Sequence, residues 1–138
     1  MRGALARLAL LALAGGAWAG GALAAQRSAP LPRPAYDRCL QGASTTVAMT
    51  GCAQAELKRQ DDALNAAYRQ ARAGLTPRQT AKLTAAQRAW IAFRDAHCAS
   101  MEDPDWGTMS RLAAVQCLID TTAERTSQLH EYPPTLER

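Results

Sequence analysis

The segment AQRAWIAFRDAHC, residues 86–98, holds the residue types from which a catalytic site is most easily built. Arg94 could bind an anion, and His97 with Asp95 as its partner could move protons. Residues two apart on a helix point in different directions, however, so Asp95 and His97 cannot act as a pair there. The sequence also lacks a GxSxG nucleophile elbow and a glycine-rich phosphate loop. We therefore predict a protein that is not an enzyme and needs no cofactor.

The first 24 residues have the pattern of a cleaved secretory signal peptide. Arg2 and Arg7 precede an apolar stretch, and Ala22-Leu23-Ala24 has the small-x-small form that signal peptidase needs. The apolar stretch is short and broken by glycines, so we expect no membrane span after cleavage. No cysteine directly follows it, which argues against a lipoprotein. We predict a periplasmic or secreted protein with a signal peptide over 1–24, a proline-rich leader over 25–38, a helical domain over 39–132 and a C-terminal tail over 133–138.

The charge balance gives no sign of a nucleic-acid partner. Sixteen Lys and Arg against twelve Asp and Glu give a net charge of +4, and loss of Arg2 and Arg7 leaves 14 against 12, or +2. No contiguous basic run accompanies this weak excess. The chain that remains after cleavage is long enough for one small domain.

Four cysteines follow the signal: Cys39, Cys52, Cys98 and Cys117. No two have the CxxC spacing that brings two thiolates to one zinc ion, so no metal site is expected. An even number of cysteines in a small exported domain predicts two disulfides. We favour Cys39–Cys52 with Cys98–Cys117, which closes two short loops. The alternative, Cys52–Cys98 with Cys39–Cys117, would tie the first helix to the other two.

No segment alternates between apolar and polar residues as a β-strand does, whereas long stretches show helical periodicity. Turn signals separate three such stretches, and two consecutive prolines follow the last. Short connections place neighbouring helices antiparallel. We therefore predict an all-α fold, a small three-helix antiparallel bundle with two disulfides, with helices over about residues 45–74, 76–101 and 108–129.

Local signals set the expected ends and faces of these helices. The residues Thr76-Pro77-Arg78-Gln79 form a capping box with proline at the first helical position. Gly74 suits a left-handed stop for the first helix. Val47 is assigned to the apolar positions of that helix, and Phe93 is expected to pack inside the bundle with Trp90.

The inward stripes of the helices mix large apolar side chains with polar ones, and buried polar groups need partners. If the first turn centres near residue 75, partners across it have numbers summing to about 150, which puts Asp61 level with Trp90. We expect an Asp61–Arg125 pair and a Glu56–Arg94 pair on either side of Trp90. The whole expected structural polar network is Glu56, Asp61, Asn65, Tyr68, Gln87, Trp90, Arg94, Thr122 and Arg125.

A tryptophan lies in the acidic turn EDPDWG, residues 102–107. We expect Trp106 to fold back onto the bundle. The alternative is an exposed anchor for a protein partner, with Asp103 and Asp105 beside it.

Four sequence elements together resemble the lysozyme-inhibitor LprI-like family of small exported bacterial proteins: CLQGASTTVAMTGCAQAE, DDALNAAY, AQRAWIAFRDAHC and CLIDTTAERTSQL. The resemblance covers roughly residues 39–129. It implies a helical domain outside the cytoplasm and inhibition of lysozyme. The residues carried over are the polar and aromatic ones placed inside the bundle, so they specify the fold rather than an inhibitory loop. The 18 residues between Cys98 and Cys117 exceed the spacing in shorter members and form an extension bearing Trp106.

The expected function is that of a non-catalytic exported protein that inhibits lysozyme in the cell envelope. The alternative is an envelope module that binds another protein or an anionic wall polymer and leaves lysozyme untouched. The acidic turn offers a local attraction to cationic lysozymes, which a net charge of +2 by itself does not. The expected partner is therefore lysozyme or another envelope protein.

Overall fold

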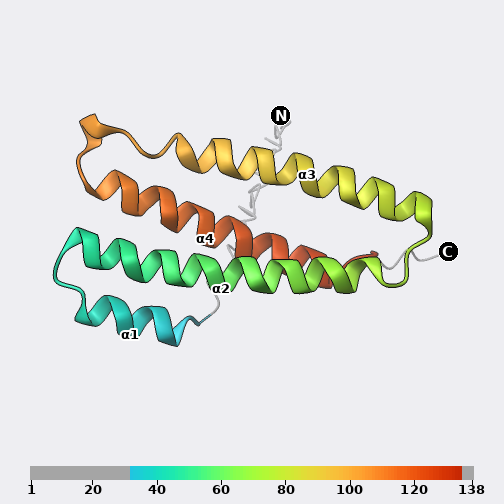
Figure 1. Cartoon of the computed structure of the whole chain (residues 1–138), viewed down its shortest axis with the longest axis horizontal. Coiled ribbons are helices and arrows are strands. Elements are labelled where there is room, and N and C mark those ends of the chain that lie inside the picture. Colours follow the sequence, from blue (N-terminus) through green and yellow to red (C-terminus); the bar gives the residue numbers. More distant parts are fainter. Residues whose placement is uncertain (1–31, 135–138) are drawn as a thin grey trace, which may run out of the picture.

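The computed structural model describes residues 32–134, and over this range the chain is helical with no strand (Figure 1). It contains four α-helices, one more than the bundle expected from the sequence. The signal peptide, most of the leader and the last four residues lie outside the described part. The elements are α1 (Pro34–Gly42), α2 (Thr46–Arg72), α3 (Pro77–Ala99), the 3₁₀ turn η1 (Pro104–Trp106) and α4 (Met109–His130).

The additional helix, α1, begins inside the segment that was expected to be an extended leader. Pro34 occupies the start of the helix, where the missing proline N–H removes no helical hydrogen bond. The prolines led us to assign residues 34–38 to the leader, whereas these residues form the first part of α1. Tyr36 is buried against α2 and α4, and this contact supplies the tertiary energy that so short a helix needs.

The expected helix starts are confirmed, whereas the expected glycine stop is wrong. The Thr45 hydroxyl accepts a hydrogen bond from Ala48 N, and Thr76 and Gln79 form the full capping box of α3. Gly74 is not among the left-handed residues of the described chain, because Ala73 N–H and Leu75 N–H close the end of α2 with short-range bonds to Gln70 and Arg72. Gly107, with φ of 76°, takes that conformation between η1 and α4.

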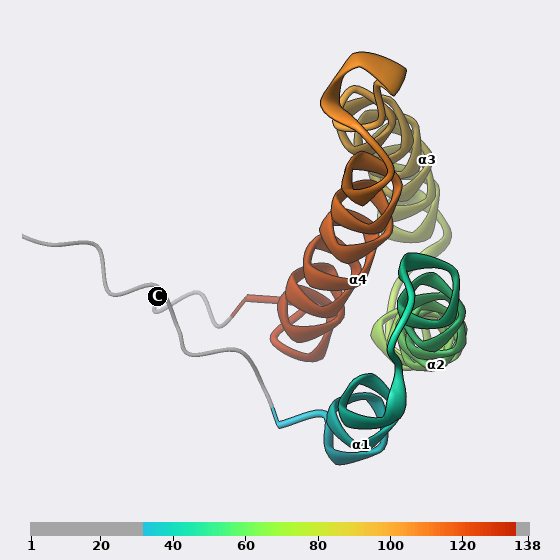
Figure 2. The ribbon, with the colours of Figure 1, turned by 90° about the vertical axis from the view of Figure 1, so that its left-hand side faces the viewer.

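The four helices lie in a curved layer in the order α3, α4, α2, α1 (Figures 1 and 2). The contact between α2 and α4 is the largest between any two helices. One core cluster contains Tyr36, Cys52, Ala53 and Ile119 at the end where α1 turns into α2. The other lies toward the α2–α3 turn and is formed by Leu64, Ala67, Ala71, Leu83 and Leu129.

Helix α3 lies at the edge of this layer, and most of its surface faces solvent. Leu83, Gln87 and Cys98 are its buried residues. Phe93 is 59% exposed, so the expectation that it packs inside the bundle is wrong. Val47, assigned to the apolar face of α2, is 84% exposed. An open layer buries less of each helix than a closed three-helix bundle, and this accounts for both differences.

Polar contacts fasten α1 to the neighbouring helices. The Tyr36 hydroxyl donates to Gln116 Oε1 at 2.8 Å, and Arg33 Nη1 lies 2.8 Å from Asp120 Oδ1. Arg33, just before α1, also approaches the buried carboxylate of Glu56 at 3.9 Å. The disulfide Cys39–Cys52 closes the opposite end of α1 onto α2.

Replacement of Ile119 tests the central packing. Its side chain is fully buried, so Ile119→Ala should lower the free energy of unfolding by about 2–5 kcal/mol through lost burial and a cavity. Val47→Ala is the control and should change it by less than about 0.5 kcal/mol, since that side chain faces solvent. Chemical denaturation of both variants checks this, and equal losses would contradict the packing.

The free energy of unfolding should fall at alkaline pH because Tyr36, which docks α1, ionises. Burial raises the pKa of the Tyr36 hydroxyl above its usual 10.0, while nearby Arg33 opposes the shift. The unfolded chain then loses this proton first, so ionisation favours unfolding and stability falls as pH rises above about 10. In Tyr36→Phe this contribution is absent, and the free energy of unfolding should fall less steeply with pH. Parallel pH profiles for the two proteins would refute the expectation.

Candidate functional site

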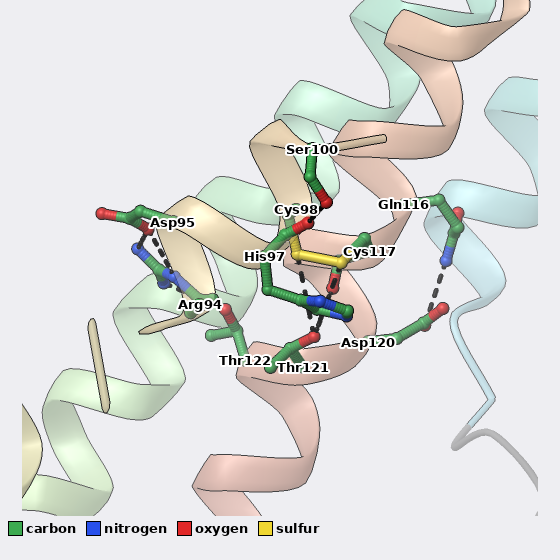
Figure 3. The surroundings of a disulfide bond; sticks show 10 residues. All are labelled: Arg94, Asp95, His97, Cys98, Ser100, Gln116, Cys117, Asp120, Thr121 and Thr122. Atoms are coloured by element: carbon green, nitrogen blue, oxygen red, sulfur yellow. Dashed lines mark hydrogen bonds and ion pairs between the residues drawn. A yellow bond between two sulfur atoms is a disulfide. The ribbon is translucent and has the colours of Figure 1, made fainter. Parts of the chain in front are cut away.

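Two disulfides join Cys39 to Cys52 and Cys98 to Cys117, which confirms the favoured pairing over its alternative. All four cysteines are used. Figure 3 shows the second bond linking the last turn of α3 to α4. Disulfides of this kind persist in oxidising compartments, so the chemistry places the folded domain outside the cytoplasm. In the described range, no helix has the length and apolarity required to span a membrane.

The polar network centres on Trp90, which lies between two guanidinium groups. The guanidinium carbons of Arg94 and Arg125 lie 5.3 Å and 5.9 Å from the ring centroid. Arg94 Nη1 donates to Asp61 Oδ1 and to Thr122 Oγ1, each at 3.1 Å. These contacts connect α3 to α2 and to α4 at once.

The partners within this network differ from the expected ones. Arg94, not Arg125, pairs with Asp61, at 3.1 Å. Arg125 Nε instead donates to Gln87 Oε1 at 3.0 Å. Side-chain reach across the helices decided which residues of the expected network met.

Glu56 also has different partners. Its carboxylate is 4% exposed and accepts hydrogen bonds from Arg59 at 2.8 Å and Gln60 at 2.6 Å. Arg33 is the third neighbour, at 3.9 Å. The expected Glu56–Arg94 pair is therefore wrong, and the reason is α1, whose presence brings Arg33 over this part of α2.

The remaining members of the expected network divide between buried and exposed positions. Tyr68 and Thr84 share a hydrogen bond of 2.9 Å between α2 and α3. Thr122 is fully buried. Asn65 is exposed, so its expected place inside the bundle is wrong.

The residues that first suggested catalysis are directed to separate partners. Asp95 Oδ1 lies 2.8 Å from Arg94 Nη2, whereas the His97 ring stacks on Phe93 at 5.4 Å between centroids. Asp95 and His97 are labelled on separate sides of the helix end in Figure 3. This arrangement supports stacking and ion pairing, and it does not place the imidazole against the carboxylate.

Trp106 is 65% exposed, so the expectation that it folds back onto the bundle is wrong. The turn that carries it is nevertheless well braced. Asp103 Oδ1 accepts from Asp105 N at 2.8 Å. Ser110 Oγ lies 2.9 Å from the carbonyl oxygen of Asp103 and 2.7 Å from that of Gly107, and its single proton is shared between them. The turn therefore presents the indole ring to solvent on a defined backbone.

An open groove of about 890 Å³ lies between this turn and the start of α2. Val47 and Pro104 contribute apolar walls, and Thr46 Oγ1 contacts Met109 Sδ at 3.9 Å across the two helix starts. Met109 is 53% exposed. Sequence reasoning missed this apolar patch, because Val47 fits a helical apolar stripe and only its position beyond the core leaves it uncovered.

The Arg94 contacts generate a stability prediction. Asp61→Ala should lower the free energy of unfolding by about 1 kcal/mol or less, because the Asp61 side chain is 43% exposed. Arg94→Ala should cost more, about 1–3 kcal/mol, since buried Thr122 loses its donor and Trp90 loses a stacked cation. Denaturation of both variants tests this ranking, and Lys58→Ala, which breaks an exposed pair, serves as control. A larger loss for Asp61→Ala would contradict it.

Comparison with known proteins gives one finding. A family model described as lysozyme inhibitor LprI matches residues 37–129, about two thirds of the chain and nearly all of the described helices. No curated protein and no solved structure gives a match. The match includes both disulfides, the Trp90 network and the turn that carries Trp106. The chain belongs to the lysozyme inhibitor LprI family.

Proposed function

We propose that this protein is an exported, non-catalytic inhibitor of lysozyme, and that it contacts the enzyme through the η1 turn and the adjacent groove. The observation that carries the proposal is Trp106, a large aromatic side chain held 65% exposed on a braced turn. Family membership supplies the class of partner. The exposure of Trp106 on this turn supports the choice of surface.

Two further exposed apolar side chains lie on the helix starts beside the groove. Val47 is 84% exposed and Met109 53% exposed, and both belong to the helix starts that flank the groove. Tryptophan is among the residues that most often dominate binding energy at protein interfaces, especially when neighbouring contacts exclude water around it. In a complex with lysozyme, we expect Val47, Met109 and the groove to provide contacts next to those of Trp106.

Carboxylates surround the same turn. Asp105 is exposed beside Trp106, Asp103 is half-buried, and Glu102 lies 3.1 Å from Arg111. Many lysozymes are strongly cationic, so this local acidity complements them and raises the rate of productive encounter. The effect is short in range, because exposed charges are screened beyond about 10 Å at moderate salt.

The remainder of the fold acts as a scaffold for this turn. The disulfide Cys98–Cys117 closes the segment that contains η1, with a sequence separation of 19 residues. A turn fixed before binding loses less conformational entropy in the complex, which strengthens association. The Trp90 network then holds α3 and α4 in the relative position on which the turn depends.

Export completes the proposal. A cleaved signal over residues 1–24 would deliver the chain to the periplasm or the medium, where its disulfides form and lysozyme attacks the wall. The competing function is an envelope module that binds another protein or an anionic wall polymer without affecting lysozyme. A panel of lysozymes from several classes distinguishes the two functions.

Replacement of Trp106 tests the surface. In a lysis assay with signal-free, oxidised protein, Trp106→Ala should weaken inhibition by roughly 30-fold or more, the loss typical of a dominant interface residue. Phe93→Ala is the matched control, because Phe93 is 59% exposed on α3 and lies away from the groove. It should inhibit as the parent does.

Each outcome of that assay has a clear meaning. Stoichiometric loss of lysis for one lysozyme class, sensitive to Trp106 and insensitive to Phe93, supports inhibition through the turn. If Trp106→Ala and Phe93→Ala weakened inhibition equally, the η1 turn would not be the surface that contacts lysozyme. No inhibition of any class at high molar excess would overturn the function itself and favour the envelope module.

A further inference from the structure

The end of the molecule opposite η1 carries a concentration of cations that form no ion pair with the described residues 32–134. Between residues 63 and 93 the sequence has five Lys or Arg and no Asp or Glu. The ion pairs of the described chain involve other cations. All five side chains are exposed. These five residues, here called the basic end, are Arg69, Arg72, Arg78, Lys82 and Arg88.

The turn between α2 and α3 brings these residues together. Arg69 and Arg72 lie in the last turn of α2, while Arg78 and Lys82 lie in the first turns of α3. Figure 1 shows that this turn is at the far end of the molecule from η1. Along α3, Arg78 and Arg88 are separated by ten residues, or about 15 Å of helix. The positive charge therefore extends over the turn and along one helix.

Charge placement at the basic end is not explained by helix stability. Cations in the last turn of α2 complement the negative end of its dipole, but Arg78 and Lys82 lie at the positive end of α3 and oppose its dipole. Like charges gathered on adjacent turns repel one another. Glu131, at the end of α4, is one exposed carboxylate at this end of the layer, and it leaves the local excess strongly positive.

The shape and chemistry of the basic end select the kind of anion. The groove lies at the opposite end, and the five cations stand on exposed helical surface. Exposed large apolar side chains are also absent from residues 63–90 of the described chain, so this end offers no anchor for a bilayer interior. Four of the five cations are Arg, whose planar fork matches phosphate oxygens in pairs.

We propose that the basic end binds an extended phosphate-bearing polymer, the chemistry of an anionic wall polymer. A chain of regularly spaced phosphates can contact the α2–α3 turn and α3 together, which a single phosphate cannot. The proposal is independent of lysozyme inhibition, because it concerns a different surface. With both surfaces occupied, the polymer would hold an inhibitor at the wall with its Trp106 turn directed away.

Binding to long-chain inorganic polyphosphate tests the proposal with full-length mature, oxidised protein. The triple variant Arg69→Gln, Arg78→Gln and Lys82→Gln should bind at least roughly tenfold more weakly at low salt, with a salt dependence reduced by about two counterions. Gln preserves helix propensity, and circular dichroism with chemical denaturation verifies folding. The control, Arg38→Gln, Lys58→Gln and Arg111→Gln, removes the same charge elsewhere and should bind as the parent does.

The remaining arms separate the alternatives. Orthophosphate, added at the phosphate concentration at which polyphosphate saturates the protein, should not displace polyphosphate. Phosphatidylglycerol vesicles should bind the protein more weakly than polyphosphate does. Equal losses for the two triple variants would overturn the proposal, since net charge alone would then explain binding. Absence of polyphosphate binding at low salt, or binding to vesicles alone, would overturn it as well. Lysozyme inhibition by the basic-end variant should stay unchanged.

Discussion

The guanidinium group of Arg94 is the constraint on which the arrangement of the helices depends. Helix α3 contributes few buried apolar residues, so packing alone holds it weakly. Arg94 bonds to Asp61 on α2 and to Thr122 on α4, and it stacks on Trp90 of its own helix. Together with the disulfide to Cys117, these contacts fix α3 at the edge of an open layer.

This open arrangement separates the scaffold from the surfaces available for binding. The segment AQRAWIAFRDAHC supplies the contacts that hold α3, while the proposed inhibitory contact lies in the turn that follows it. The η1 turn carries an aromatic side chain and carboxylates at one end, and the basic end carries an excess of cations at the other. A protein of small net charge can therefore offer two surfaces of opposite character.

Local chemistry was predictable, and contacts between distant residues were not. The Thr45 and Thr76 caps follow from residues within one helical turn, and the two disulfides follow from spacing that favours short loops. The contacts of Arg94 with Asp61 and Thr122, and the approach of Arg33 to Glu56, depend on how the helices are placed, which no local signal encodes. The bonds of Glu56 to Arg59 and Gln60 are local to α2. Proline content hid α1 itself, although Pro34 at its first position is compatible with a helix start.

The sequence alone determined an all-helical domain and a framework of two disulfides, because both rest on local periodicity, spacing and residue type. It also singled out polar residues such as Asp61, Arg94 and Arg125 as candidates for contacts between helices. Tertiary structure decided which of those residues met and which aromatic side chains stayed exposed. Phe93 and Trp106 were both expected to be covered, and both face solvent. Exposure depends on where a neighbouring helix ends, and the open layer of α3, α4, α2 and α1 leaves both rings beyond its reach.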